Sequence, residues 1–151
     1  MARILVVDDE PAVRSLMSVT LKLAGHDVTE ASGGEEALKL IEKTPYDVIV
    51  LDIMMPVTDG YEVLQRLRAM SARADTPVIV ATAKGYDAEG MLRESSGGAV
   101  DHLSKPFDPE DLESAVARIL ESTGRDLETR RRMHTRAAEV YSAIDKLRSQ
   151  I

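Results

Sequence analysis

Close to the start of the chain the sequence reads Ile4-Leu5-Val6-Val7-Asp8-Asp9-Glu10, in which four apolar residues are followed directly by three acidic ones. The same arrangement returns at 48–52, where the apolar run ends at Asp52, and at 78–82, where it ends at Thr82. Continuously apolar strands are typical of the centre of a parallel sheet, where both faces are buried. The carboxyl ends of such strands share one edge, which is where open α/β sheets bind ligands.

Short apolar strands alternate with segments of helical periodicity as far as residue 121. The strands are expected at 3–7, 27–31, 47–51, 77–81 and 99–103, and the helices at 11–24, 34–43, 59–70, 87–95 and 108–121. Strands that are each followed by a helix predict an α/β fold: a doubly wound, five-stranded parallel sheet with right-handed crossovers and both faces covered. The mixed composition of 27–31 predicts an edge strand.

Composition sets wider bounds on the protein. A chain of 151 residues, 44% of them hydrophobic, suits one globular domain with a short addition. The absence of cysteine excludes disulfides and thiolate metal sites. No apolar run approaches the roughly 18 residues of a membrane span, and the N-terminus lacks a signal-peptide pattern. We therefore expect a cytoplasmic protein without a membrane partner.

The net charge of −7 is shared unevenly along the chain. Residues 1–121 carry 12 Lys and Arg against 22 Asp and Glu, a net charge of −10, whereas residues 122–151 carry +3. An acidic body argues against nucleic acid as a partner of this chain. The basic tail leaves room for an anionic contact, although a solvated helix face explains it more simply.

Residues 122–151 are predicted to form a helical extension beyond a domain at 1–121. Its apolar residues recur at spacings of 4, 3, 4, 3 and 4, as in the seam of a coiled coil: Met133, Ala137, Val140, Ile144, Leu147 and Ile151. The repeat is shorter than the roughly three or four heptads that define a coiled coil. The helix could fold back on its own domain, pair with a second copy as a homodimer, or lead into an output domain that this sequence lacks. We favour pairing or continuation.

The side chains at the expected strand ends indicate phosphate chemistry. Asp52 is the candidate nucleophile, because a carboxylate can attack a phosphoryl group and form an acyl phosphate. Asp8 and Asp9 would repel Asp52 unless a cation lay between them. Mg²⁺ suits such a site, since it prefers carboxylate and other oxygen ligands. Lys105 offers a positive charge and Thr82 a hydroxyl donor to the phosphoryl oxygens.

Residues 3–121 resemble the receiver domain of two-component response regulators. The matching motifs are Ile4-Leu5-Val6-Val7-Asp8-Asp9-Glu10, Asp52-Ile53-Met54-Met55-Pro56 with Asp59-Gly60, Ala81-Thr82-Ala83 and Lys105-Pro106-Phe107. The resemblance implies a flavodoxin-like strand order of 2-1-3-4-5. It also implies a phosphorylation-activated response regulator, in which Asp52 accepts a phosphoryl group from a sensor histidine kinase, a phosphotransfer protein or a small phosphodonor.

The same resemblance assigns the residues of the site. Asp9, Asp52 and the main-chain carbonyl of Met54 would bind Mg²⁺ directly, with Asp8 acting through water. Thr82 and Lys105 would bind the phosphoryl group, and the Lys105–Pro106 bond is expected to be cis. Phosphorylation would then shift the surface of the fourth and fifth helices and allow a downstream protein target to bind.

One position departs from the family pattern. The family usually has Tyr or Phe three residues before the lysine, as a ring that moves inward with the threonine, and here that residue is His102. Two interpretations stay open. His102 is an exposed polar residue at a strand end, or it is a smaller switch ring that titrates near neutral pH.

Other functions fit less well than a phospho-acceptor signalling domain, which we expect not to be an enzyme. A hydrolase of the haloacid dehalogenase type needs an acid two residues after its nucleophile, and residue 54 is methionine. A flavin binder of the same topology would need a Ser, Thr or Gly-rich phosphate loop where this chain has Asp8-Asp9-Glu10-Pro11. The remaining alternative is a degenerate or constitutive receiver that acts as a dimerisation or scaffold module. The full set of phosphorylation residues argues against it.

Overall fold

The computed structural model of the protein describes residues 2–83, 101–121, 136, 138–140 and 142–147. The described part of the chain contains one parallel sheet in the order β2-β1-β3-β4-β5. Its strands are β1 (Arg3–Val7), β2 (Asp27–Ala31), β3 (Val48–Asp52), β4 (Val78–Ala83) and β5 (Asp101–Lys105). The sheet confirms the predicted fold class and strand order, with β2 at an edge as its mixed composition indicates.

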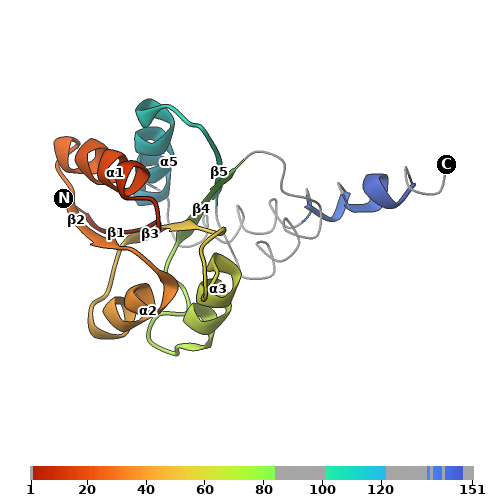
Figure 1. The fold of residues 1–151 in the computed structure, drawn as a ribbon, viewed down its shortest axis with the longest axis horizontal. Helices are drawn as coiled ribbons and strands as arrows, with labels where there is room; N and C mark the ends of the chain where they lie inside the picture. The colour runs from red at the N-terminus through yellow and green to blue at the C-terminus, as the bar shows by residue number, and fades with distance from the viewer. Residues whose placement is uncertain (1, 84–100, 122–135, 137, 141, 148–151) are drawn as a thin grey trace.

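Helices cover both faces of this sheet. They are α1 (Pro11–Leu23), α2 (Gly34–Lys43), α3 (Gly60–Ala69) and α5 (Pro109–Glu121). In Figure 1, α1 and α5 lie on one side of the sheet, and α2 and α3 lie on the other. The helix predicted at 87–95 lies outside the described residues.

Each central strand contributes side chains to two separate apolar cores. In β1, Leu5 and Val7 belong to the core beneath α2 and α3, whereas Ile4 and Val6 belong to the core beneath α1 and α5. Successive side chains of a strand point to opposite faces, so a strand buried on both faces must be apolar at every position. This requirement explains the uninterrupted apolar runs that precede Asp8 and Asp52.

Local sequence signals set where the helices begin and end. Pro11 occupies the first turn of α1, where its missing N–H removes no intrahelical hydrogen bond. Asp59 caps α3, because its side chain accepts a hydrogen bond from the Glu62 amide at 3.0 Å. Gly25 follows α1 with a φ of 93°, a conformation that glycine adopts without steric cost.

β3 ends one residue later than predicted, at Asp52, and β4 and β5 each end two residues later. β4 continues through Ala83 rather than ending at residue 81, and β5 continues through Lys105 rather than ending at residue 103. The ladder extends because Thr82 pairs with Ser104 and Ala83 pairs with Lys105. Main-chain pairing does not depend on apolar side chains, so the hydrophobic pattern placed both ends too early. Residues 99 and 100 lie outside the described part of the chain.

The C-terminal segment is helical at 138–140 and 142–147. Residues 122–135 are outside the described part, so the boundary at residue 121 between domain and extension stays a prediction. Over the ranges that the structure describes, none of the helices combines the length and apolar character that a membrane crossing requires.

Candidate functional site

Three carboxylates meet at the carboxyl ends of two neighbouring strands. β1 and β3 pair in parallel, with Val7 opposite Leu51, so the residues that follow them emerge side by side. One carboxylate oxygen from each of Asp8, Asp9 and Asp52 lies within 4.8 Å of the others. Asp8 is fully buried and Asp52 is 3% exposed. The structure therefore brings together the three acidic residues that the sequence predicts as a cluster.

Lys105 reaches this cluster from β5. Its Nζ lies 2.7 Å from Asp8 Oδ2 and 3.5 Å from Asp52 Oδ2. The following Lys105–Pro106 bond is cis, as predicted. Among the described residues, Lys105 brings one positive charge to this cluster, which contains three ionisable carboxylates. The cluster thus keeps a surplus of negative charge even with the lysine in place.

Burial and crowding change the acid–base behaviour of this site. Burial, as the larger cause, and the negative charge of Asp8 together raise the pKa of Asp52 to about 6. Lys105 opposes this rise, as does the Met54 amide, which donates to Asp52 Oδ1 at 3.1 Å. Burial alone would lower the pKa of Lys105, but its hydrogen bond to Asp8 and the charges of Asp52 and Asp8 raise it overall.

The donor set fits Mg²⁺. Hard oxygen donors are the ligands this ion prefers, and it commonly uses one or two carboxylates while keeping several waters. Both oxygens of Asp8 already accept hydrogen bonds, Oδ1 from the Glu10 amide at 2.9 Å and Oδ2 from Lys105. Asp52 Oδ1 likewise accepts a hydrogen bond from the Met54 amide, so direct coordination by Asp9 and Asp52 and the indirect role of Asp8 stay predictions.

Arg14 supports the loop that carries Asp8 and Asp9. Its Nη1 donates to the main-chain carbonyl of Asp8 at 2.9 Å, and its Nε lies 3.3 Å from Glu30 Oε1 on β2. The guanidinium therefore ties the β1–α1 loop to the neighbouring edge strand. The sequence analysis did not single out Arg14. The available signal was a basic side chain one helical turn after Glu10, a position that also suits an ordinary surface arginine.

The loop between β3 and α3 is held by residues that the sequence analysis also missed. Thr58 is 6% exposed and donates its hydroxyl hydrogen to Glu35 on α2, and Glu35 also accepts a hydrogen bond from Arg66 on α3. Glu35 lies 23 residues before Thr58 and 31 before Arg66. No local pattern connects residues at such separations, so the contact is visible only in the folded molecule.

The remaining predicted residues lie on β4 and β5. The backbone of Thr82 pairs with Ser104, and its side chain is not among those described. His102 pairs with Val80, is half-buried, and places Nε2 3.2 Å from Ser104 Oγ. The segment at 87–95 lies outside the described residues, so the switch role of His102 stays a prediction.

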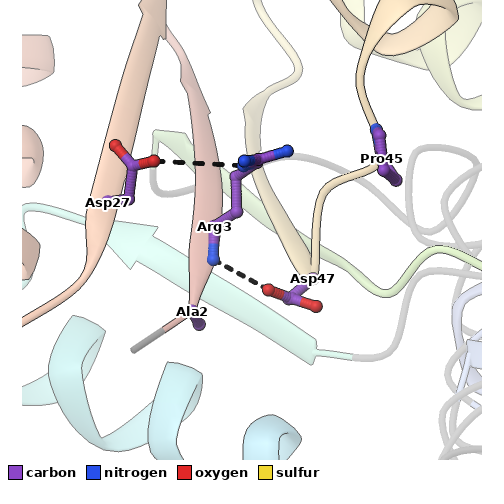
Figure 2. Close-up of a pocket in the computed structure, with 5 residues that line it drawn as sticks. All are labelled: Ala2, Arg3, Asp27, Pro45 and Asp47. Atoms are coloured by element: carbon purple, nitrogen blue, oxygen red, sulfur yellow. Dashed lines mark hydrogen bonds and ion pairs between the residues drawn. The ribbon is translucent and has the colours of Figure 1, made fainter.

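A hollow of about 320 Å³ lies at the amino-terminal ends of the strands, opposite the carboxylate cluster (Figure 2). It is lined by Ala2, Arg3, Asp27, Pro45 and Asp47. The Arg3 guanidinium lies 3.9 Å from Asp27, and the Arg3 amide donates to Asp47 at 2.8 Å. These residues precede or begin the strands, so the hollow is separate from the carboxylate cluster.

Comparison with known proteins agrees with this geometry. The response regulator receiver domain family matches residues 4–117. The chain is 41% identical over 125 residues to the DNA-binding dual master transcriptional regulator RpaA of Synechocystis, a match that covers 83% of this chain and 52% of RpaA. It is 36% identical over 121 residues to the phosphate regulon transcriptional regulatory protein PhoB of Pseudomonas aeruginosa, covering 80% and 52% of the two chains.

Solved structures agree as well. The chemotaxis protein CheY4 of Vibrio cholerae matches with a TM-score of 0.74 and 36% sequence identity, over 79% of this chain and 98% of CheY4. The chain spans about half the length of the curated relatives RpaA and PhoB. The family match includes all four residues that converge in the site: Asp8, Asp9, Asp52 and Lys105. The chain therefore belongs to the response regulator receiver domain family.

Proposed function

We propose that this protein is a phosphorylation-controlled signalling switch whose phospho-acceptor is Asp52. The observation that carries the proposal is the convergence of Asp8, Asp9 and Asp52 within 4.8 Å, with the Lys105 ammonium 3.5 Å from Asp52. A sensor histidine kinase or a phosphotransfer protein is the proposed donor. Asp52 acts here as an acceptor in signalling, and the proposal assigns no turnover of a separate substrate.

The transfer itself is a substitution at phosphorus. An oxygen of the ionised Asp52 carboxylate forms a bond to phosphorus, and the bond from phosphorus to the donor histidine nitrogen breaks. The electron pair of the broken bond returns to the imidazole nitrogen. With acetyl phosphate as donor, acetate leaves instead. The product in both cases is an aspartyl phosphate.

The surrounding residues neutralise the charge of the incoming group. Lys105 already contacts Asp8 and Asp52, so its ammonium is available to a phosphoryl oxygen at Asp52. Bound Mg²⁺ would supply further neutralisation, with Asp9, Asp52 and the Met54 carbonyl as proposed direct ligands and Asp8 acting through water. We assign Thr82 to a second phosphoryl oxygen.

The proposed output is a change in the surface that includes α5. RpaA is described as DNA-binding and PhoB as a transcriptional regulator, and this chain covers about half of each. We propose that the downstream partner of the receiver part is a protein rather than nucleic acid. The net charge of −10 over residues 1–121 supports this choice, since a phosphate backbone would be repelled.

We also propose that the C-terminal helix pairs with the same helix of a second copy. Ala138 is fully buried, whereas Val140, Ile144 and Leu147 are 54%, 44% and 63% exposed. The three seam residues that the structure describes are thus exposed, whereas the buried Ala138 is not part of the seam. An apolar seam with heptad spacing is complementary to a copy of itself, so we expect the same helix of a second chain to cover it.

The test of the acceptor is incubation with acetyl phosphate and Mg²⁺, followed by mass measurement of the intact protein. We expect one added phosphoryl group, which is lost in Asp52→Asn and when EDTA removes the metal. Asp47→Asn, at the opposite edge of the sheet, is the matched control and should be labelled like the wild type. An unlabelled wild type, or equal labelling of Asp52→Asn, would overturn the proposal.

A further inference from the structure

We infer that Thr58, held by Glu35, is a positioning residue for the β3–α3 loop at residues 53–59 and so for Mg²⁺ binding beside Asp52. The inference rests on the proposed function. Thr58 Oγ1 donates to Glu35 Oε1 at 3.2 Å, and Arg66 Nη1 donates to the same oxygen at 2.8 Å. One carboxylate oxygen therefore ties the loop to both α2 and α3.

The loop is packed closely around this contact. A Cβ added at Gly34, the first residue of α2, would lie 2.7 Å from both the Thr58 carbonyl oxygen and its Cγ2. Real Cβ atoms do not approach main-chain atoms so closely, so glycine is required for α2 to reach Thr58. With Thr58 only 6% exposed, its hydroxyl has a single described acceptor and little access to water. The side chain is thus fixed by shape as well as by its hydrogen bond.

The start of the loop is held next to Asp52. The amides of Met55 and Gly60 both donate to the Ile53 carbonyl, at 3.2 and 2.9 Å. A Cβ at Gly60 would lie 2.5 Å from the Asp52 carbonyl oxygen. The first residue of α3 is therefore packed directly against the main chain of Asp52. The loop is therefore anchored at its two ends by main-chain contacts and between them by Thr58.

Between these anchors Met55 is buried in the core beneath α2 and α3, but the residues on either side of it are exposed. Met54 is 66% exposed, and Val57 is fully exposed with a φ of 68°. Positive φ is a genuine outlier for a β-branched residue and persists only where the surroundings determine it. The neighbouring anchor at Thr58 supplies that constraint. Loss of the anchor should let the exposed residues on either side of Met55 relax, among them Met54, whose main chain is assigned to the metal.

Glu35, which accepts both hydrogen bonds, stays negatively charged to a lower pH than an ordinary glutamate. The Arg66 guanidinium beside Glu35 holds the pKa of that carboxyl below its ordinary value. Glu35 and Arg66 are both about half exposed, so their ion pair adds little stability by itself. The contact therefore matters more for the position of Thr58 than for the stability of the domain.

The test compares Mg²⁺ affinity in variants that change only this contact. Thr58→Val keeps the shape but removes the donor, Thr58→Ser restores a hydroxyl, and Thr20→Val removes a hydroxyl that donates to Leu16 O on α1. By calorimetric titration we expect Thr58→Val to weaken Mg²⁺ binding by about three- to tenfold, the effect of one lost hydrogen bond. Thr58→Ser and Thr20→Val should bind Mg²⁺ like the wild type.

A second pair of variants covers the case in which Thr58→Val does not fold. Glu35→Ala removes the acceptor at an exposed position, and Glu36→Ala removes its neighbour, which bonds Ser32 instead. We expect weaker Mg²⁺ binding only for Glu35→Ala. Unchanged Mg²⁺ affinity in Thr58→Val or Glu35→Ala, with a wild type that binds the ion, would overturn this inference alone. A wild type that binds no Mg²⁺ would overturn the proposed function.

Discussion

At the scale of single residues, Asp52 combines burial with negative charge. Its pKa rises from the ordinary 3.8 to about 6, first because of burial and then because of Asp8. Between these two values the folded state holds a proton that the unfolded chain has released. Stability therefore falls as pH rises from about 4 to about 6, and the loss remains in full at higher pH. The acceptor is kept reactive at a cost to the stability of the metal-free domain.

Asp52→Asn should reverse that loss, because the amide carries no charge at any pH. Without Mg²⁺ at pH 7.5, we expect the free energy of unfolding to rise by about 1–3 kcal/mol, up to the full effect of a shift of about two pKa units. The gain should grow from pH 4 to pH 6 and then stay constant. Urea unfolding across this range measures it. A gain that is largest at low pH would contradict the assignment.

Lys105 shows why stability and function cannot be separated at this site. Its Nζ contacts Asp8 and Asp52, so it offsets part of the repulsion that Asp52 creates. The net rise of the Asp52 pKa to about 6 already includes this attraction, so without Lys105 the pKa would rise further. Wild-type protein with saturating Mg²⁺ should recover most of the difference.

At the scale of elements, the start of α3 sets the shape of the acceptor loop. Gly60→Ala would normally favour a helix by up to about 1 kcal/mol. Here the new Cβ would lie 2.5 Å from the Asp52 carbonyl oxygen and 2.6 Å from Ile53 Cα. We expect a net destabilisation of about 1–3 kcal/mol, as for other overpacked sites, together with slower phosphorylation of Asp52.

Gly33→Ala is the matched control for that substitution. A Cβ at Gly33 meets nothing within 4 Å, and its extended φ of −167° suits any residue. Gly33 is the N-cap of α2, a position where alanine is less favoured than glycine. We therefore expect Gly33→Ala to lower the free energy of unfolding by less than about 1 kcal/mol. Urea unfolding and labelling by acetyl phosphate compare the two variants. Equal losses would show that close packing at Asp52 is not the cause.

At the scale of the whole molecule, the exposed seam of the C-terminal helix predicts self-association. Ile144→Lys places a charge in this seam, which a paired helix would bury. Light scattering over a range of protein concentrations should give a dimer for the wild type and a monomer for Ile144→Lys. Phosphorylation of Asp52 should be unchanged.

Asp145→Lys is the control for that experiment, since it adds a lysine at the exposed neighbour outside the seam. It should dimerise like the wild type. A wild type that stays monomeric at every concentration, or a control that dissociates equally, would contradict pairing through the seam. The first outcome would assign the helix to continuation toward a further domain, and the second would place the dimer contact outside the seam.

Much of the fold was predictable because it depends on local patterns. The apolar run before Asp52 indicates a doubly buried strand, and Pro11 and Asp59 indicate helix starts, all as observed. The end of β5 was not predictable in this way. His102 and Ser104 are polar, and only pairing with β4 extends the strand to Lys105.

The sequence by itself determined the layers of the molecule and the residue types at the strand ends, because periodicity, caps and motifs are properties of neighbouring residues. The tertiary structure alone decided which side chains hold that site in place. Arg14 beside Glu30 and Glu35 on Thr58 join segments that meet only when the chain has folded. Such contacts depend on distances in space, and a linear pattern does not encode them.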